Sequence, residues 1–397
     1  MIFRLAKPYW AILFSCLCMF ALGLSDNIRG PLFPELLNAF GISNSVGSLS
    51  FALASGAAFV ATVLSASILR RVHLDLMLLL SVIFMGFGLL VVGSADAFFV
   101  YLIGTFIYGF SLGTTGVAQN LLIAENVDKQ IQTKALAGLH SIYGLSSFLA
   151  PFLAAHSAGV ASSLFPGFAK LGGWQSAFFV TAFICFVVGI FITSTRVEPK
   201  FVFQEKKNDA VETPNKFNLK FALLMSGFFA TYVGAEILVS TRLALYMRTY
   251  HDMNLEQSSR YVTYFFVFLL IGRLTFTMIN LKWPLKTQLN LSLLLSALFT
   301  VFGLWLHPFF LTLVGLAMAP FYPLAVVYIS DLTGLMKRKY LTFVMSAQGV
   351  LVISMHMGVG YLTDLFGLFF AFSVSLVLLA ISIICLNLKT FNAVKTE

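Results

Sequence analysis

The chain has 397 residues, of which 59% are hydrophobic and 10% charged, and its formal net charge is +9. A soluble domain carries roughly 45–50% apolar and about 25% charged residues. This composition therefore excludes soluble globular, disordered and disulfide-rich secreted proteins and predicts an integral membrane protein. The positive charge is explained by membrane topology and by anionic lipid rather than by nucleic-acid binding.

Long runs without Asp, Glu, Lys or Arg predict the membrane-crossing helices, because each crossing needs about 20 mostly apolar residues. The run 287–330 holds two helices, with a break expected at His307-Pro308. Two further apolar segments, about 218–245 and 261–281, are interrupted by charged residues: Glu236 and Arg242 in the first, and Arg273 in the second. The sequence thus predicts an all-α membrane protein of about twelve helices. The charge-free runs are 8–25, 36–69, 76–95, 97–124, 135–169, 171–195, 287–330, 340–363 and 365–388.

Lys and Arg gather in alternate connections, and short loops rich in these residues lie in the cytoplasm. With the N-terminus inside, most basic residues fall on the cytoplasmic side, so we expect both termini there. The basic N-terminal stretch continues into a full apolar span without a small-residue cleavage pattern, which predicts a retained first helix rather than a signal peptide. We expect a multi-pass protein of the bacterial inner membrane.

A charge-dense stretch with two prolines, 196–217, lies near the midpoint and separates six predicted spans from six. We predict an N-terminal six-helix bundle at 1–195, a cytoplasmic linker at 196–217 and a C-terminal six-helix bundle at 218–397. Equal halves indicate parallel repeats about an axis along the membrane normal, whereas an ordinary long loop would not require them. Each half also has one acid, Asp26 or Glu236, roughly 24 to 29 Å along its first helix.

Short motifs in both halves of the chain resemble those of a known protein family. The segments are Tyr232-Val-Gly234-Ala-Glu236, Leu243-Ala-Leu-Tyr246, Ile271-Gly272-Arg273, Leu139-His140-Ser-Ile-Tyr143-Gly144, Ala150-Pro151 and Ala319-Pro320-Phe-Tyr-Pro323. Together they resemble the fucose/proton symporter-like branch of the major facilitator superfamily. This resemblance implies two pseudo-symmetric six-helix bundles (the major facilitator fold) and secondary transport of a sugar.

The chain also departs from its relatives. Arg242 stands where that branch has a tryptophan, and Gly113-Thr114-Thr115-Gly116 replaces the acid expected shortly before Asn120. The loop after the second helix keeps Arg70 and Arg71 but lacks the acid and glycines usual in the superfamily. The helix-five glycines of drug antiporters are missing, which argues against a drug exporter.

Charged groups at membrane depth are costly and usually face a water-filled path or a partner. Glu236 is the leading proton-coupling candidate, since its apolar surroundings favour proton uptake; the alternative is a permanent ion pair with an arginine on another helix. Asp26 is the second candidate. Arg29 lies three residues on, on the same helix face, and pairing with it would leave Asp26 ionised and structural. The guanidinium of Arg242 favours a carboxylate or phosphate, although it could instead snorkel or pair with an acid.

The remaining candidates are polar residues within predicted spans. Histidines there can relay protons or simply pack, and amides can bind a solute or join helices. The solute-binding candidates are Asn27, Arg29, Gln119, Asn120, His140, Tyr143, Arg242, Gln348 and His356. Gating candidates at or near cytoplasmic helix ends, where a solvated loop is the alternative, are Arg70, Arg71, Glu125, Asp128, Arg273 and Asp331.

No phosphate-binding glycine loop, nucleophile–base pair or metal-ligand cluster occurs in the sequence, so we expect neither an enzyme nor a cofactor. The leading hypothesis is proton-coupled symport of a small polar solute, a sugar or an organic anion, by alternating access. Its alternatives are a proton-driven exporter or antiporter and a non-transporting membrane sensor. The expected partners are the solute, a proton or other cation and membrane lipid, with no nucleic acid, and the protein is expected to be monomeric.

Overall fold

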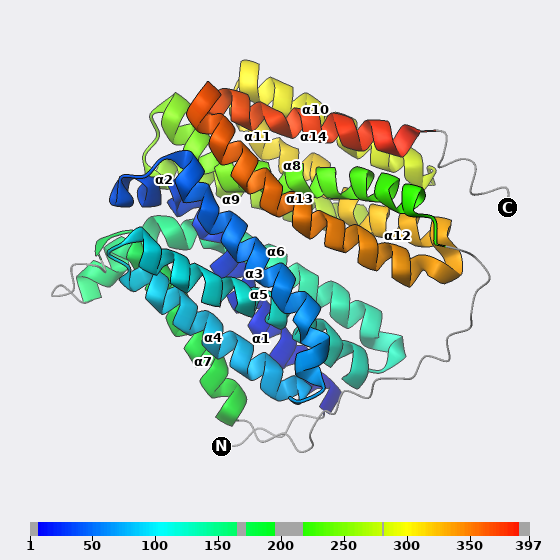
Figure 1. Ribbon diagram of the computed structural model, residues 1–397, viewed down its shortest axis with the longest axis horizontal. Helices are drawn as coiled ribbons and strands as arrows, with labels where there is room; N and C mark the ends of the chain where they lie inside the picture. Colours follow the sequence, from blue (N-terminus) through cyan, green and yellow to red (C-terminus); the bar gives the residue numbers. More distant parts are fainter. Residues whose placement is uncertain (1–6, 165–171, 195–216, 280–281, 389–397) are drawn as a thin grey trace. The chain divides into compact units, whose positions relative to one another are not determined.

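The computed structural model describes residues 7–164, 172–194, 217–279 and 282–388. Within these ranges the regular secondary structure is helical and no strand occurs (Figure 1). This follows from the apolar runs, because a chain crossing hydrocarbon must satisfy its backbone hydrogen bonds within each segment. The predicted all-α membrane fold is confirmed.

The first seven helices precede the predicted linker. They are α1 (Lys7–Asn27), α2 (Arg29–Phe40), α3 (Asn44–Leu69), α4 (Leu74–Ser94), α5 (Phe98–Asn126), α6 (Lys129–Leu164) and α7 (Gln175–Ser194). α2 continues the path of α1 after a single intervening residue, Ile28, which keeps helical torsion angles. α2 ends at Phe40 and is capped by Gly41, where a φ of 60° suits a residue without a side chain.

The later helices follow the linker. They are α8 (Leu219–His251), α9 (Leu255–Met278), α10 (Leu285–Trp305), α11 (Phe309–Met318), α12 (Phe321–Thr333), the 3-10 turn η2 (Gly334–Met336), α13 (Lys337–Phe366) and α14 (Leu368–Asn387). The break expected at His307-Pro308 falls between α10 and α11. A second interruption, at Ala319-Pro320, divides α11 from α12.

Eleven segments among the described residues are long and apolar enough to cross a membrane, with α11, α12 and η2 together forming one of them. α9 is not among the eleven. It carries Glu256, Arg260 and Arg273, which lower its hydropathy although its length suffices. With α9, the described chain provides the two sets of six crossing segments that the sequence predicts.

Backbone contacts divide the chain into two compact units. Described residues of the first unit fall within Met1–Ile42, Ser50–Glu205 and Asn254–Thr263, and those of the second within Ser43–Leu49, Lys206–Met253 and Tyr264–Glu397. The start of α3 therefore groups with the second unit. The predicted linker 196–217 lies, apart from its last residue, outside the described residues, so the predicted boundaries stay a prediction.

In the first unit, α1 packs against α5, α6 and α7, and α4 packs against α5 and α7. Glycines let α3 approach α5 closely. A Cβ atom at Gly109 would lie 2.6 Å from the Cα of Ala54, and one at Gly113 would lie 2.2 Å from the carbonyl oxygen of Ala58. Only a residue without a side chain permits this spacing, which is common where membrane helices pack.

In the second unit, α8 contacts α11, α12, α13 and α14 (Figure 1). It is the most buried of the eleven candidate spans among the described residues. The close approach of the first unit is repeated here on other helices. A Cβ atom at Gly315 of α11 would lie 2.2 Å from the carbonyl oxygen of Phe265 on α9. In each unit, therefore, a glycine lets the fourth crossing segment pack closely on the second: α5 on α3 in the first unit and α11 on α9 in the second. This correspondence is expected of repeats.

Candidate functional site

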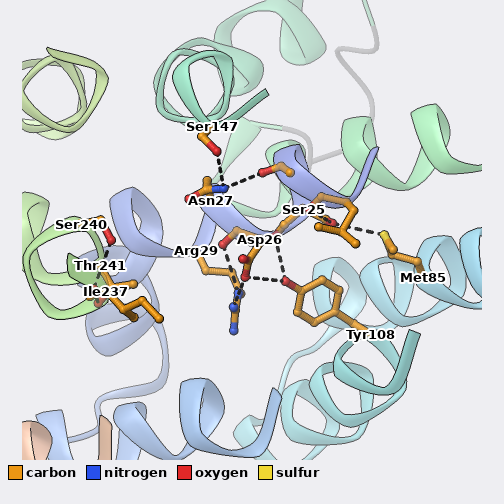
Figure 2. Close-up of polar contacts among 12 residues, drawn as sticks. Ser25, Asp26, Asn27, Arg29, Met85, Tyr108, Ser147, Ile237, Ser240 and Thr241 are labelled. Carbon is orange, nitrogen blue, oxygen red and sulfur yellow. Dashed lines mark hydrogen bonds and ion pairs between the residues drawn. The ribbon is translucent and has the colours of Figure 1, made fainter. Parts of the chain in front are cut away.

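Asp26 lies at the end of α1, just before the interruption at Ile28. Its carboxylate accepts hydrogen bonds from three side chains. Oδ1 accepts from Nη2 of Arg29 at 2.6 Å and from the hydroxyl of Tyr108 at 3.3 Å, and Oδ2 accepts from the hydroxyl of Tyr143 at 3.0 Å. Figure 2 shows Arg29 and Tyr108 directed at Asp26. Helices α1, α2, α5 and α6 each supply one member of this cluster.

Arg29 is held by aromatic rings as well as by Asp26. Its guanidinium carbon lies 5.0 Å from the ring centroids of both Phe51 and Tyr108, a cation–π distance. Of the two alternatives for Asp26, pairing with Arg29 or separation from it, the structure has the pair.

Asn27 joins α1 to α6 beside this pair. Its Nδ2 donates to the carbonyl of Gly23 at 2.9 Å, to the hydroxyl of Ser147 at 3.0 Å and to the hydroxyl of Tyr143 at 3.3 Å. The contact with Ser147 is drawn in Figure 2. Asp26, Asn27, Arg29 and Tyr143, all predicted site residues, therefore form one polar cluster within the first unit.

Glu236 is the centre of a second polar cluster, on α8 in the second unit. Its Oε2 lies 2.8 Å from the hydroxyl of Tyr232, and its Oε1 lies 3.6 Å from Nη2 of Arg273 on α9. The side chain of Glu236 is 19% exposed and that of Arg273 is 32% exposed. Arg273, predicted as a gating residue, thus lies beside the predicted proton site; its gating role stays a prediction.

Arg242 is buried in the second unit rather than exposed at an interface. The residue is 2% exposed, and its Nη2 donates to the hydroxyl of Ser48 at 2.7 Å. Ser48 belongs to the first turns of α3, which group with this unit. Snorkelling to the membrane surface is therefore not the arrangement that the structure has.

The two amide side chains of α5 that were predicted to bind solute form hydrogen bonds within the first unit. Gln119 is 1% exposed and donates to the sulfur of Met19 at 3.1 Å, while its Oε1 is buried with no hydrogen-bond partner among the described residues. Asn120 donates to the carbonyl of Gly116 at 2.7 Å. Neither amide joins the Asp26 cluster by a described hydrogen bond.

The remaining solute-binding candidates differ in burial. His140 of α6 is exposed, Gln348 of α13 is half-buried and His356 of α13 is buried. Nothing in the described structure tests their solute-binding roles, which stay predictions.

The other gating candidates are exposed near helix ends. Arg70, one residue beyond the end of α3, donates to the hydroxyl of Ser67 in the last turn of that helix at 3.1 Å. The exposed set is Arg70, Arg71, Glu125, Asp128 and Asp331. Their roles also stay predictions.

Sequence reasoning missed three contributors. Tyr108 binds Asp26, Tyr232 binds Glu236, and Asp364 caps α3 by accepting from the backbone N–H groups of Asn44 at 3.0 Å and Ser45 at 2.8 Å. Asp364 had one signal in the sequence, since it is the charge that separates the runs 340–363 and 365–388. No group of three His, Cys, Asp or Glu side chains in the described part of the chain is placed to hold a metal ion.

Comparison with known proteins gives the family. The sequence profile of the Major Facilitator Superfamily matches residues 15–350. No match was found among curated protein sequences.

Solved structures with the same fold extend over nearly the whole chain. A bacterial homolog of the human lysosomal transporter Spinster has a TM-score of 0.75 at 13% identity, covering 100% of this chain and 98% of that one. A D-xylose–proton symporter has a TM-score of 0.74 at 13% identity, covering 96% and 97%. The E. coli fucose:proton symporter FucP has a TM-score of 0.61 at 15% identity, covering 96% and 98%.

Proposed function

The chain belongs to the Major Facilitator Superfamily, a family of multi-pass membrane transporters, and from that premise we propose that it is a proton-coupled symporter of a small polar solute. Transport proceeds by alternating access, in which the two six-helix bundles 1–195 and 218–397 rock about a solute site near the membrane midplane. The observation that carries the proposal is the carboxylate of Glu236, largely buried on α8 and bonded to Tyr232.

Glu236 is assigned as the main proton site because its ion pair is the looser of the two. Its contact with Arg273 is 3.6 Å, beyond direct hydrogen-bond distance, whereas Asp26 meets Arg29 at 2.6 Å. A loosely paired, largely buried carboxylate can gain and lose a proton as access alternates. Asp26, which is in direct contact with Arg29, is the second proposed proton-coupling residue.

The solute is a sugar or an organic anion. Two of the similar structures are named as sugar–proton symporters, which supports a sugar. The guanidinium of Arg242, buried beside Ser48, supports a carboxylate, because arginine recognises that group through paired N–H donors. The proposed solute-binding set is Asn27, Arg29, Gln119, Asn120, His140, Tyr143, Arg242, Gln348 and His356.

The remaining parts of the proposal concern topology and gating. The protein is a monomer of the bacterial inner membrane with both termini and the linker in the cytoplasm, as the distribution of Lys and Arg supports. Arg70, Arg71, Glu125, Asp128 and Asp331 form and break cytoplasmic ion pairs as the inward gate closes and opens. Such exposed pairs are individually weak, which suits contacts that must break in every cycle.

The test uses the purified full chain. A thermal-shift screen against D-xylose, L-fucose and a series of carboxylates identifies a ligand, because ligands stabilise the state that they bind. In liposomes containing a pH-sensitive dye, that ligand should carry protons inward with it. Glu236→Gln should abolish accumulation driven by a pH gradient but retain counterflow exchange. Full gradient-driven accumulation by this variant, or solute flux without proton flux in the unmodified protein, would contradict the proposal.

A further inference from the structure

Tyr232 places one hydroxyl group between two acceptors. Its oxygen lies 2.8 Å from Oε2 of Glu236 and 2.7 Å from the backbone carbonyl oxygen of Met318. A phenol has one hydrogen to donate, and an ionised carboxylate and a carbonyl can only accept. Both contacts cannot be full hydrogen bonds while Glu236 is ionised.

A proton on Glu236 satisfies both contacts. The carboxylic O–H then donates to the oxygen of Tyr232, and the hydroxyl of Tyr232 donates to Met318. When the proton leaves, the single hydrogen of Tyr232 turns to the carboxylate, because a hydrogen bond to a charged group is about twice as strong as a neutral one. The carbonyl of Met318 then loses its donor from α8.

The carbonyl of Met318 lies at the interruption between α11 and α12. Met318 is the last residue of α11, and α12 begins at Phe321 after the Ala319-Pro320 interruption. Pro320 has no N–H to continue the helical pattern, and Leu316 instead accepts from Ala319 at 3.4 Å.

The ring of Tyr232 also contacts α12. It stacks on Phe321, the first residue of that helix, with ring centroids 3.7 Å apart and an angle of 18° between the rings. Tyr232 is fully buried. It therefore contacts both helices that meet at the interruption, by its hydroxyl on one side and by its ring on the other.

Other groups facing Glu236 set the balance between its two states. Arg273 approaches from α9 at 3.6 Å and favours the ionised form, while Tyr322 of α12 is close enough to interact electrostatically with both Glu236 and Arg273. A direct bidentate pair would hold the proton off permanently. At 3.6 Å, Arg273 and Glu236 do not form such a pair.

We propose that Tyr232 is a positioning residue that transmits the protonation of Glu236 to the α11–α12 interruption. When Glu236 is protonated, the hydroxyl of Tyr232 donates a hydrogen bond to the carbonyl of Met318. This bond joins α8 to the end of α11 and restrains the α11–α12 interruption. With Glu236 ionised, that bond is released and the two short helices can change their angle. The inference rests on the proposed role of Glu236 as the proton site.

The experiment needs protons only and uses the purified full chain. Infrared difference spectra between acidic and alkaline pH report the carbonyl band of a protonated carboxylic acid, assigned to Glu236 as the band that Glu236→Gln removes. Amide hydrogen exchange of the segment 312–324, corrected for the intrinsic effect of pH, reports opening of the interruption. One released hydrogen bond should raise exchange about 2- to 12-fold at alkaline pH.

Variants separate the steps. Tyr232→Phe removes the hydroxyl and retains the stacked ring, so the Glu236 band should still titrate while exchange stays fast at both pH values. Glu236→Gln, which mimics the protonated acid, should give slow exchange at both. Tyr246→Phe is the matched control: Tyr246 is also buried on α8, at 3% exposed, but its ring packs on Phe372, and this variant should behave like the unmodified protein.

The outcomes test the role of Tyr232 and the proposed proton site at Glu236 separately. If the Glu236 band titrates but Tyr232→Phe keeps pH-dependent exchange, the inference is wrong and the proton site stands. Fast exchange in Glu236→Gln would overturn the inference even if Tyr232→Phe could not be purified. If no Glu236 band titrates, the proposed proton site itself fails.

Discussion

Arg29 and Asp26 form an ion pair of 2.6 Å in which the cation is the more deeply buried partner, at 11% exposed against 31% for the acid. The two residues flank the point at which α1 gives way to α2. Nη1 of Arg29 is buried and has no hydrogen-bond partner within the described part of the chain. Arg29 therefore depends strongly on Asp26 for compensation of its charge, whereas Asp26 also accepts hydrogen bonds from two tyrosine hydroxyls.

This asymmetry predicts unequal effects of breaking the pair. Asp26→Ala leaves a buried, uncompensated guanidinium and should destabilise the protein by about 2–4 kcal/mol, whereas Arg29→Met should cost only about 1–2 kcal/mol. The double variant should cost less than the sum of the two. Thermal unfolding of the purified protein in detergent measures all three.

Arg260→Met is the control, because it breaks the Glu256–Arg260 pair, whose side chains are 47% and 59% exposed. No measurable change in Tm is expected there. An Asp26→Ala variant as stable as the Arg29→Met variant would show that the two charges do not depend on each other as the structure indicates.

The sequence predicted the fold well because the signal is local. A charge-free run of sufficient length specifies a crossing helix whatever surrounds it, and even the break at His307-Pro308 is encoded by neighbouring residues. α9 shows the limit of that signal. Its Arg273 lowers the apparent hydropathy, and the compensating acid, Glu236, lies on another helix, which no local pattern reveals.

The site was harder to predict because it depends on contacts between helices. The spacing of Asp26 and Arg29 placed both on one helix face but could not decide whether they pair. Tyr108, which binds Asp26, is one of 13 tyrosines in the chain, and composition does not single it out. Tyr232 lies in a segment that resembles the symporter branch, but nothing in the sequence assigned it a role. The sequence placed Arg273 near a helix end, whereas its partner, Glu236 on α8, became evident only from the structure.

Substitution of Arg242 should affect the binding of a carboxylate and of a neutral sugar differently. If Arg242 receives a carboxylate, Arg242→Gln should weaken binding of a carboxylate ligand about 10-fold or more, because a charge-assisted bidentate contact contributes about 1.5–3 kcal/mol. Binding of a neutral sugar should change little. Isothermal titration with the ligand found by thermal shift measures this, and Arg242→Lys, which keeps the charge but loses the fork, should recover only part of the affinity. Equal losses for sugar and carboxylate would indicate a structural role.

Removal of the Asp364 carboxylate should destabilise the start of α3. Its carboxylate accepts from the backbone N–H groups of Asn44 and Ser45 and from Nδ2 of Asn44 at 3.1 Å. Loss of such a cap typically costs about 1 kcal/mol. Asp364→Ala should therefore lower Tm modestly and raise amide exchange in the first turn of α3, and Asp364→Asn should restore part of both. Unchanged exchange in that turn would mean that the cap contributes nothing.

Gly113 and Gly116 provide a matched pair on one helix for testing the packing of α3 on α5. A Cβ atom at Gly113 would lie 2.2 Å from the carbonyl oxygen of Ala58, and backbone cannot move aside as a flexible side chain can, whereas a Cβ atom at Gly116 would meet nothing within 4 Å. Gly113→Ala should therefore separate the two helices and destabilise the protein by about 1–3 kcal/mol. Gly116→Ala should be neutral or stabilising by up to about 1 kcal/mol, because alanine favours the helix and restricts the unfolded chain. Thermal unfolding of the two variants in the same detergent decides the matter, since similar losses from both would show that these glycines serve flexibility of α5 rather than its contact with α3.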